Sequence, residues 1–227
     1  MFTGIVRGIG TVTAIEKKQG LHTIEIEFPA GAAEGLELGA SVAVDGVCLT
    51  VCRFSDTTAA FDVMQQTLQT TTLGALEKGS RINIERAAKA DQEIGGHQLS
   101  GHVDCTASVV KVERPENNHV LTMRVPEQWR KYLFAKGYIA VNGASLTIAS
   151  CDRRTGDFTV WLIPETLRLT TFGEKGHDAV LNIEVDRTTQ ILVDTVYGFL
   201  EERLASRDFQ ALAASLALPD RRSSEQE

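Results

Sequence analysis

The sequence predicts a mainly β protein with two tandem six-stranded barrels, Greek-key-like connections and a C-terminal amphipathic helix. Three observations lead to this prediction. The stretch "VAVDGVCLTV" at residues 42–51 returns as "IAVNGASLTI" at residues 139–148, so the chain contains an internal duplication. Apolar and polar residues alternate in both copies, as they do in half-buried strands. An apolar segment near the C-terminus has helical spacing and no counterpart in the first half.

The first barrel is expected to span residues 1–97 and the second residues 98–187. The stretch "FTGIVRGIGTVTAIE" aligns with "LSGHVDCTASVVKVE", and further along "TLQTTTLG" aligns with "TLRLTTFG". In "TIEIEF", Ile24 and Ile26 share one face of a strand because side chains alternate across it. Closing such strands into a barrel removes exposed sheet edges, so a closed barrel is expected in each repeat.

Turns are expected at equivalent places in the two repeats. Asp45-Gly46 in the first repeat and Asn142-Gly143 in the second are turn signals between strands. A short helix is expected around "AGAAEGLEL" or "PEQWRKYLFAKG". The two halves are therefore predicted to share both their strands and their connections.

Residues 188–207 are expected to form the C-terminal helix. Its apolar residues recur at helical spacing, namely Leu192, Val193, Val196, Phe199, Leu200 and Leu204. Since both barrels are complete without this helix, we expect it to pack on another subunit. Residues 208–227, which end in the polar stretch "PDRRSSEQE", are expected to be a disordered tail.

The composition disfavours several classes of function. A formal net charge of −7 and a pI near 5.3 leave no excess of Lys and Arg for phosphates, so nucleic-acid binding is not expected. The chain has no apolar run of roughly 18 residues and no signal-peptide pattern, so no membrane association and a cytoplasmic location are expected. The four cysteines lack C-x-x-C spacing and are interpreted as thiols.

The signatures of nucleotide, dinucleotide and zinc-protease sites are missing, so neither an organic cofactor nor a metal is expected. The densest polar cluster is "GGHQLSGHVDC". Three interpretations of it are open. His97, His102 and Cys105 could bind a metal, or the segment could be a structural connection between barrels. In the third interpretation His102 carries protons, because an imidazole titrates at roughly pH 6.5.

The two repeats differ chemically at equivalent positions. Ile5 of the first repeat corresponds to His102 of the second, and Cys48 corresponds to Ser145. A threonine follows both Cys48 and Ser145 by two residues, and residues two apart on a strand share a face. Each repeat therefore presents a pair of SH or OH groups on one surface. Such a surface suits a pocket that binds the donors and acceptors of a flat heterocycle.

Five motifs of the chain resemble the riboflavin synthase family: "MFTGIV", the repeated "GVCLTV" and "GASLTI", "GGHQLSGHVD" and "LIPETL". The resemblance covers about residues 1–205. It implies a cofactor-independent transferase in which two 6,7-dimethyl-8-ribityllumazine molecules exchange a four-carbon unit, giving riboflavin and 5-amino-6-(ribitylamino)uracil. It also implies a homotrimer joined through the C-terminal helix, with each site between two subunits. The sequence says nothing of an association with lumazine synthase.

The resemblance implies one lumazine pocket for each repeat. The first would be lined by Gly4, Ile5, Val6, Cys48, Leu49, Thr50, Asp62, Val63, Met64, Gln65, Gln66 and Thr67. The second would be lined by Gly101, His102, Val103, Lys136, Ser145, Leu146, Thr147, Trp161, Leu162, Ile163, Pro164, Glu165 and Thr166. Lys136 would reach across the subunit boundary. Gln65 and Gln66 depart from the family pattern, so the first pocket is expected to bind differently.

The resemblance also implies a catalytic set of Phe2, Ser41, Cys48, His102, Thr147 and Asp186. His102 with Thr147 would transfer the proton of the acidic C7 methyl group, and Ser41 and Cys48 would orient or add to the acceptor ring. Asp186 could equally cap the following helix. Phe2 is expected to form a packing or stacking wall, since it has no proton to give.

Two other classes of protein remain as alternatives. A non-catalytic lumazine- or flavin-binding protein of the lumazine-protein type would share the fold, but such proteins lack the "GGHQLSGH" segment. An oligonucleotide-binding double barrel is disfavoured by the acidic charge and by an aromatic content of only 6%, which gives few surfaces for base stacking. The enzyme is therefore the leading hypothesis.

Overall fold

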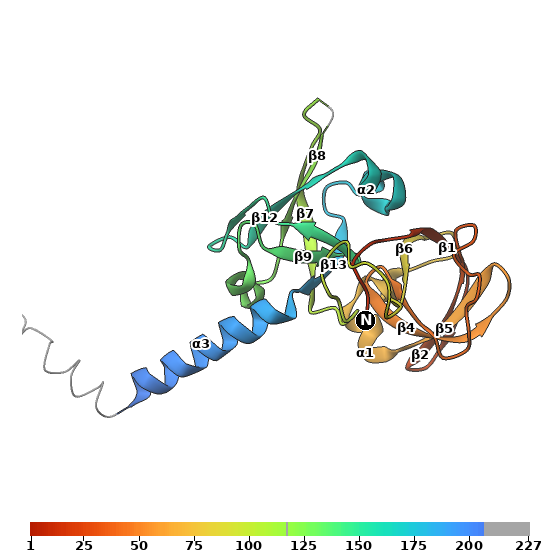
Figure 1. Ribbon diagram of the computed structural model, residues 1–227, viewed down its shortest axis with the longest axis horizontal. Coiled ribbons are helices and arrows are strands. Elements are labelled where there is room, and N and C mark those ends of the chain that lie inside the picture. Colours follow the sequence, from red (N-terminus) through yellow and green to blue (C-terminus); the bar gives the residue numbers. More distant parts are fainter. Residues whose placement is uncertain (117, 207–227) are drawn as a thin grey trace, which may run out of the picture. The chain divides into compact units, whose positions relative to one another are not determined.

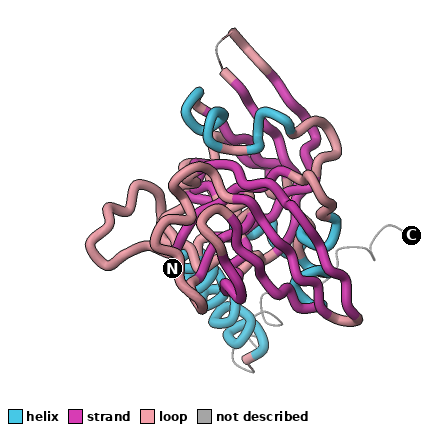
Figure 2. The backbone as a smooth tube through the Cα atoms, turned by 90° about the vertical axis from the view of Figure 1, so that its right-hand side faces the viewer, coloured by secondary structure: helices cyan, strands magenta, loops and turns pink. Residues whose placement is uncertain are grey.

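The computed structural model describes residues 1–116 and 118–206, so the predicted tail at residues 208–227 lies outside the described residues. The chain divides into two units, Met1–Arg187 and Thr188–Glu227. The first unit holds both sheets, which lie side by side in Figure 1. Figure 2 shows that strands and loops make up most of this unit, and that its helices are short.

The first repeat forms a closed barrel with the strand order β1-β2-β5-β4-β3-β6, as predicted. Neighbouring strands are antiparallel throughout. The strands are β1 (Gly8–Lys18), β2 (Leu21–Glu27), β3 (Ser41–Val44), β4 (Val47–Phe54), β5 (Thr58–Met64) and β6 (Arg81–Arg86). Between β5 and β6 lie two short helices, α1 (Gln65–Thr70) and the 3-10 helix η1 (Thr72–Ala75).

The second repeat follows the same path but forms a curled seven-stranded sheet where a closed six-stranded barrel was expected, with the order β10-β9-β13-β7-β8-β12-β11. Its elements are β7 (Cys105–Glu113), β8 (His119–Arg124), η2 (Glu127–Tyr132), β9 (Tyr138–Val141), β10 (Ala144–Thr147), β11 (Ser150–Asp152), β12 (Asp157–Leu162), α2 (Pro164–Leu169), η3 (Thr171–Glu174) and β13 (Val180–Val185).

The additional strand arises because the counterpart of β4 is divided into β10 and β11, with Ile148 and Ala149 between them. The first repeat has an irregularity at the same place, where the β4–β5 register shifts between Val51 and Arg53. Both repeats therefore bend here. In the first repeat a bulge absorbs the bend, whereas in the second the ladder is interrupted and the sheet is curled.

The strand alternation places the core of the first barrel as predicted, with Ile24 and Ile26 fully buried. The expected short helix is present in one of the two candidate segments: "PEQWRKYLFAKG" contains the 3-10 helix η2, whereas residues 30–38 form only turns. Gly31, Gly35 and Gly39 adopt positive φ angles in and beside that segment. A left-handed residue stops helix propagation, so these turns do not extend into a helix.

A buried polar network joins the two repeats. The side-chain amide of Asn83 donates to the carbonyl oxygen of Asn142 at 3.0 Å, and that of Asn182 donates to the carbonyl oxygen of Asp45 at 2.9 Å. Both donors come from the "NIE" stretches of β6 and β13, and both acceptors lie in the predicted turns. The reciprocal bonds fix the repeats relative to each other, which places their equivalent surfaces at defined positions.

The second unit contains most of helix α3 (Arg187–Ala205). This is the predicted C-terminal helix, with bounds close to the expected 188–207. Five of the predicted apolar side chains are exposed along it, namely Leu192, Val196, Phe199, Leu200 and Leu204. None of the helices in the described part of the chain has the length and apolar content that crossing a membrane requires.

Candidate functional site

The segment that precedes the first strand of each repeat crosses to the other repeat. The two segments pair with each other at Phe2 and Leu99, through backbone hydrogen bonds of 2.9 and 3.0 Å. Beyond that point, the carbonyl oxygen of Gly4 accepts from the Ser145 amide at 2.8 Å, and that of Gly101 accepts from the Cys48 amide at 2.8 Å. Each of the two predicted pocket surfaces is thus built from both repeats.

Glycine is required at both crossing points. Gly4 and Gly101 have φ angles of 74° and 78°, in the left-handed region that other residues rarely adopt. A Cβ atom on Gly4 would lie 2.5 Å from Cβ of Ser145, and one on Gly101 would lie 2.6 Å from Cβ of Cys48. A side chain at either position would therefore push the crossing segment away from the strand on which it lies.

This crossing changes the expected grouping of the lining residues. Residues 4–6 were expected beside residues 48–50, and residues 101–103 beside residues 145–147. The hydrogen bonds instead place Gly4 against β10 and Gly101 against β4, and Val103 packs on the core of the first barrel. The sequence repeat identifies equivalent segments, but it does not specify which of two equivalent strands a segment contacts.

The first wall, defined as Ser41, Cys48, Thr50 and His102 with the residues around them, brings together three of the predicted catalytic side chains. Ser41 pairs with Thr50 across β3 and β4. Cys48 is half-buried, and its amide is bonded to Gly101. The neighbouring His102 is exposed, and its amide donates to Ser100 Oγ at 3.2 Å. A thiol and two hydroxyls therefore lie on one face of the first barrel, and the segment that carries His102 lies against it.

The end of β5 and helix α1 supply the remaining predicted residues of the first wall. Asp62 accepts a hydrogen bond from the Thr23 hydroxyl at 2.7 Å. Met64, Gln65 and Gln66 are exposed, and Thr67 is half-buried. Within the described residues, no acidic side chain occupies the first turn of α1, whereas α2 carries Glu165 there. With glutamines at positions 65 and 66, the first wall therefore lacks the negative charge that Glu165 gives the equivalent surface of the second repeat.

Five of the predicted lining residues have buried side chains: Val6, Leu49, Val63, Leu146 and Leu162. They alternate along their segments with exposed residues, as the strand geometry requires. Their side chains belong to the hydrophobic core, so these positions can contact a ligand only through backbone atoms. The sequence resemblance did not distinguish the two kinds of contact.

The second wall, defined as Ile5, His97, Tyr138, Ser145 and Thr147 with the residues around them, centres on a histidine–serine pair. His97 Nδ1 lies 2.6 Å from Ser145 Oγ. The imidazole stacks on the Tyr138 ring, with centroids 5.1 Å apart and an interplanar angle of 16°. Burial lowers the pKa of His97, while the negative charge of Asp186 opposes this shift. The neutral imidazole is favoured, which can accept the serine proton.

Tyr138 was not predicted from the sequence, and His97 was considered only as a possible metal ligand, not as a catalytic or lining residue. His97 lies in the connection between the repeats and has no counterpart in the first repeat, so the comparison of the repeats gave no signal for it. The preceding residue, Gly96, does indicate that this segment lies close to another part of the chain. A Cβ atom on Gly96 would lie 2.6 Å from the Ser145 Cβ atom, so only glycine lets the chain approach this serine.

Other parts of the second wall are apolar or strained. Ile5, Trp161 and Ile163 are all exposed, with Trp161 at 54%, and Pro164 and Thr166 follow at the start of α2. The Arg168 guanidinium beside Glu165 holds the pKa of that carboxyl group below its usual value.

Lys136 adopts φ +70°, where the equivalent Gly39 adopts φ +80°. A lysine in the left-handed region carries backbone strain, which is a common feature of functional sites.

The remaining predicted catalytic residues occupy different surroundings. Phe2 is 1% exposed and belongs to a small apolar cluster between the repeats, so it acts as a packing wall. Thr147 is exposed on β10, opposite Tyr138. It therefore lies on the second wall, while the expected partner His102 lies on the first. Asp186 directly precedes α3, as a helix cap would, and its charge also acts on His97, as a residue of the site would. Both interpretations of Asp186 therefore stay predictions.

The three side chains of the metal interpretation are not gathered. His97 bonds to Ser145, His102 is exposed beside the first wall, and Cys105 is buried in β7. Burial raises the pKa of the Cys105 thiol to about 12. In the described part of the chain, no group of three His, Cys, Asp or Glu side chains is arranged to hold a metal ion.

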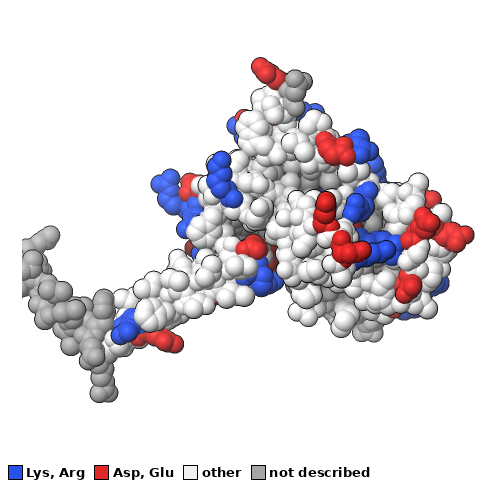
Figure 3. All heavy atoms as spheres, in the orientation of Figure 1, with Lys and Arg blue, Asp and Glu red and all other residues white. Residues whose placement is uncertain are grey.

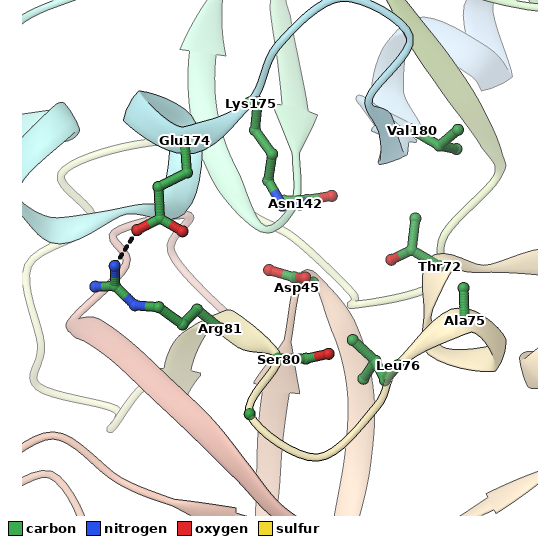
Figure 4. Close-up of a pocket in the computed structure, with 11 residues that line it drawn as sticks. Asp45, Thr72, Ala75, Leu76, Ser80, Arg81, Asn142, Glu174, Lys175 and Val180 are labelled. Carbon is green, nitrogen blue, oxygen red and sulfur yellow. Dashed lines mark hydrogen bonds and ion pairs between the residues drawn. The ribbon is translucent and has the colours of Figure 1, made fainter.

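A separate pocket lies where the two repeats meet (Figure 4). Arg81 and Glu174 form an ion pair across it, and Lys175 points toward Asn142 and Asp45. Burial raises the pKa of Asp45 from 3.8 to about 6, and the charge of Lys175 opposes this shift. The pocket contains none of the predicted site residues. It belongs to the polar junction that holds the repeats together.

Comparison with known proteins decides the family. A model of the lumazine binding domain matches residues 3–87 and again residues 100–186. The riboflavin synthase of Escherichia coli (strain K12) is 45% identical over 204 residues, which cover 89% of this chain and 95% of that protein. The chain belongs to the riboflavin synthase family. The riboflavin synthase of Bacillus subtilis (strain 168) is 39% identical over 212 residues, covering 93% of this chain and 95% of the relative.

Solved structures agree with membership of the riboflavin synthase family. The structure of LumP complexed with riboflavin superposes with a TM-score of 0.77 at 26% identity, and that of LumP complexed with 6,7-dimethyl-8-(1'-D-ribityl) lumazine with a TM-score of 0.74. Each match covers 82% of this chain and all of LumP.

On the face seen in Figure 3, acidic and basic side chains are interspersed over both sheets. That distribution suits a neutral ligand better than a polyanion.

Proposed function

We propose that the chain converts two molecules of 6,7-dimethyl-8-ribityllumazine into riboflavin and 5-amino-6-(ribitylamino)uracil. A four-carbon unit passes from one lumazine to the other, so carbon and electrons balance between the two identical substrates and no external oxidant takes part. The observation that carries the proposal is the pair of equivalent walls with different chemistry: His102, Cys48 and Ser41 on one, and His97 with Ser145 on the other.

The first wall suits removal of a proton. The exposed imidazole of His102 accepts the proton of the C7 methyl group, and the resulting carbanion attacks the second lumazine. Cys48 and Ser41, on adjacent strands of the same surface, orient the ring through their SH and OH groups. Asp62, Met64, Gln65, Gln66 and Thr67 surround the ribityl chain, to which the two glutamine amides donate and accept hydrogen bonds.

The second wall suits addition to the acceptor ring. His97 accepts the Ser145 proton across their 2.6 Å contact, and the serine oxygen adds to C7 of the acceptor lumazine. After the carbon–carbon bond between the two lumazines has formed, the C7–O bond breaks and His97 returns the proton to the serine. A nucleophile held beside a neutral base is the usual arrangement for such a step. Thr147, Trp161, Ile163 and Glu165 hold the ring and its ribityl chain, and Lys136 reaches toward the neighbouring subunit.

The two walls come together between subunits of a homotrimer. Both walls expose large apolar side chains, Met64 at 67% and Ile163 at 62%, and the apolar side chains of α3 are exposed as well. Burying these surfaces against neighbouring subunits would provide the association energy. Holding two lumazines face to face then supplies the entropic advantage of an intramolecular reaction.

The test is direct. The purified protein is mixed with 6,7-dimethyl-8-ribityllumazine, and the absorbance and yellow-green emission of riboflavin are followed together with release of the aminopyrimidine. We expect two lumazines to disappear for each riboflavin formed. A spectrum that shows bound lumazine but no riboflavin over several hours would contradict the enzyme and favour a lumazine-binding protein instead.

A further inference from the structure

Two buried glutamates occupy equivalent places at the ends of the two "NIE" stretches. Glu85 lies on β6 and is 3% exposed, and Glu184 lies on β13 and is 6% exposed. Both carboxylates accept hydrogen bonds from the crossing segment of their own repeat. Burial raises the pKa of both carboxyl groups, and these hydrogen bonds oppose the rise. Neither glutamate is among the residues assigned to the reaction.

The hydrogen bonds of Glu184 hold the segment that carries His102. Its Oε1 accepts from the Ser100 amide and from the Ser100 hydroxyl, both at 2.7 Å, and its Oε2 accepts from the Gly101 amide at 3.0 Å. The same Ser100 hydroxyl oxygen accepts from the His102 amide at 3.2 Å. The carboxylate thus fixes the backbone of the two residues that directly precede His102.

Glu85 makes the same set of bonds to the other crossing segment. Its Oε1 accepts from the amide and the hydroxyl of Thr3, both at 2.7 Å, and its Oε2 accepts from the Gly4 amide at 3.1 Å. The Thr3 hydroxyl oxygen accepts from the Ile5 amide at 3.3 Å. The two clamps have nearly equal geometry and burial, but one holds a histidine and the other an isoleucine.

A buried carboxylate is costly to keep unless several donors satisfy it, and each of these has three. Two of the three donors are backbone amides, and each bonds to a different carboxylate oxygen. A neutral side chain with a single acceptor oxygen cannot satisfy both amides in this way. The held glycine in each case is the one whose carbonyl bonds to the opposite wall, Gly101 to Cys48 and Gly4 to Ser145. The carboxylate therefore determines both where the crossing segment lies and how it meets the strand.

We propose that Glu184 is a positioning residue for the reaction: it holds His102 over the first wall, while Glu85 positions Ile5 over the second wall. This inference rests on the proposed function, because it assigns the consequence of misplacing His102 to proton transfer. Neither glutamate touches the substrate. Their roles differ only in the side chain that each clamp carries, which makes each one the matched control of the other.

The test compares Glu184→Gln with Glu85→Gln. Glutamine keeps one acceptor oxygen, but its amino group then faces a backbone amide, so one buried donor is left unsatisfied in either orientation. Because the two clamps match, we expect similar losses of thermal stability. We expect kcat to fall at least tenfold in E184Q with KM within twofold. In E85Q we expect KM to rise about fivefold with kcat within twofold, because Ile5 carries no proton and the Ser145 hydroxyl is still held by His97.

Amide hydrogen exchange provides a readout that needs no turnover. In E184Q the Cys48 amide, which donates to Gly101, should exchange at least tenfold faster, and in E85Q the same should hold for the Ser145 amide. Unchanged exchange at Cys48 in E184Q would overturn the clamp. Equal losses of kcat in both variants would overturn the positioning role. Absence of turnover in the unmodified protein would instead overturn the proposed function, whatever the exchange data show.

Milder variants guard against misfolding of the glutamine variants. Ser100→Ala and Thr3→Ala each remove one hydroxyl from a clamp and leave its two backbone bonds in place. We expect kcat to fall about threefold in S100A and to stay within 1.5-fold in T3A. A larger loss of kcat in T3A than in S100A would contradict the proposal, because the clamp that holds His102 would then matter less for the reaction than the clamp that holds Ile5.

Discussion

His97 Nδ1 lies 2.6 Å from Ser145 Oγ, so the connection between the repeats supplies a base to a hydroxyl on the second wall. Among the described residues the first wall shows no equivalent of this pair: Cys48 lies against Gly101, and the next residue, His102, is exposed. The duplicated strands therefore carry unlike chemistry because of the segments that cross over them, as well as because of the residues within them.

Replacing Ser145 by alanine should lower kcat roughly a hundredfold, as expected for loss of a positioned hydroxyl–base pair. Lumazine binding should change less than threefold, because the ring is held mainly by its stacking and apolar neighbours. Stopped-flow absorbance gives the rate and fluorescence titration the affinity. The His97→Gln variant should show the same pattern; a normal rate in either variant would remove the pair from the mechanism.

The Cys48→Ser variant should fold normally, because Ser145 occupies the equivalent position with the same half-buried exposure. A serine keeps a donor and an acceptor at this point, so kcat should fall less than tenfold. The Cys48→Ala variant loses both and should fall further. Steady-state rates compare the two, with thermal melting as the control for folding. Equal rates for serine and alanine would argue against a polar role for this side chain.

Replacing Lys136 by glycine should stabilise the fold by about 1 kcal/mol, because lysine adopts a left-handed backbone there and the equivalent position holds Gly39. KM for lumazine should nevertheless rise several-fold if the lysine reaches the site. Denaturant unfolding and steady-state kinetics measure the two effects. A stabilised variant with unchanged KM would show that the strain has no connection with the substrate.

Asp45 should make stability depend on pH. Its pKa is about 6 in the folded protein and 3.8 in the unfolded chain, so the folded state binds more protons between these values. The free energy of unfolding should therefore decrease as the pH rises from about 4 to 6, by on the order of 3 kcal/mol, and level off above that.

The Asp45→Asn variant should reduce this change to the part that comes from Glu85 and Glu184, whose pKa values are also raised. It should be more stable at pH 8, since Asn142 accepts the equivalent backbone bond from Asn182. Chemical denaturation at several pH values tests it, and Lys175→Met is the matched control for loss of the opposing charge. In K175M the decrease should be larger in total and extend to a higher pH, because the pKa of Asp45 rises further without the opposing charge. An unchanged pH profile in D45N would show that another group is responsible.

Truncation before Thr188 removes α3 and its exposed apolar side chains. If α3 joins the proposed trimer, light scattering should then show monomers, and turnover should fall at least tenfold because the proposed site between subunits is lost. Circular dichroism should show that the strand contribution of residues 1–187 is retained. A truncated protein that is still trimeric would assign assembly to another surface.

Features that depend on local pattern could be predicted from the sequence. The repeat, the alternation and the turn at Asp45 located the strands of the first barrel, and helical spacing located α3. The division of the second repeat at Ile148 and Ala149 could not be predicted, because the two copies have the same apolar pattern there. Only the way in which each ladder accommodates the bend differs.

The candidate site was predictable as a set of residues but not as an arrangement. Cys48, Ser145 and His102 stood out because they differ from their counterparts in the other repeat. The crossing of Gly4 and Gly101 was hidden, since the two segments are equivalent and either assignment fits the alignment. Contacts between distant segments depend on packing, which a comparison of repeats does not contain.

The crossed segments also impose an order on biosynthesis. The first barrel ends at Arg86, so its strands can pair while the rest of the chain is still on the ribosome. The surface around Cys48 then lacks its cover until residues 99–103 emerge, and the bonds that fasten this cover come from Glu184 near the end of β13. A nascent chain can therefore possess a folded first barrel well before it possesses a usable first wall.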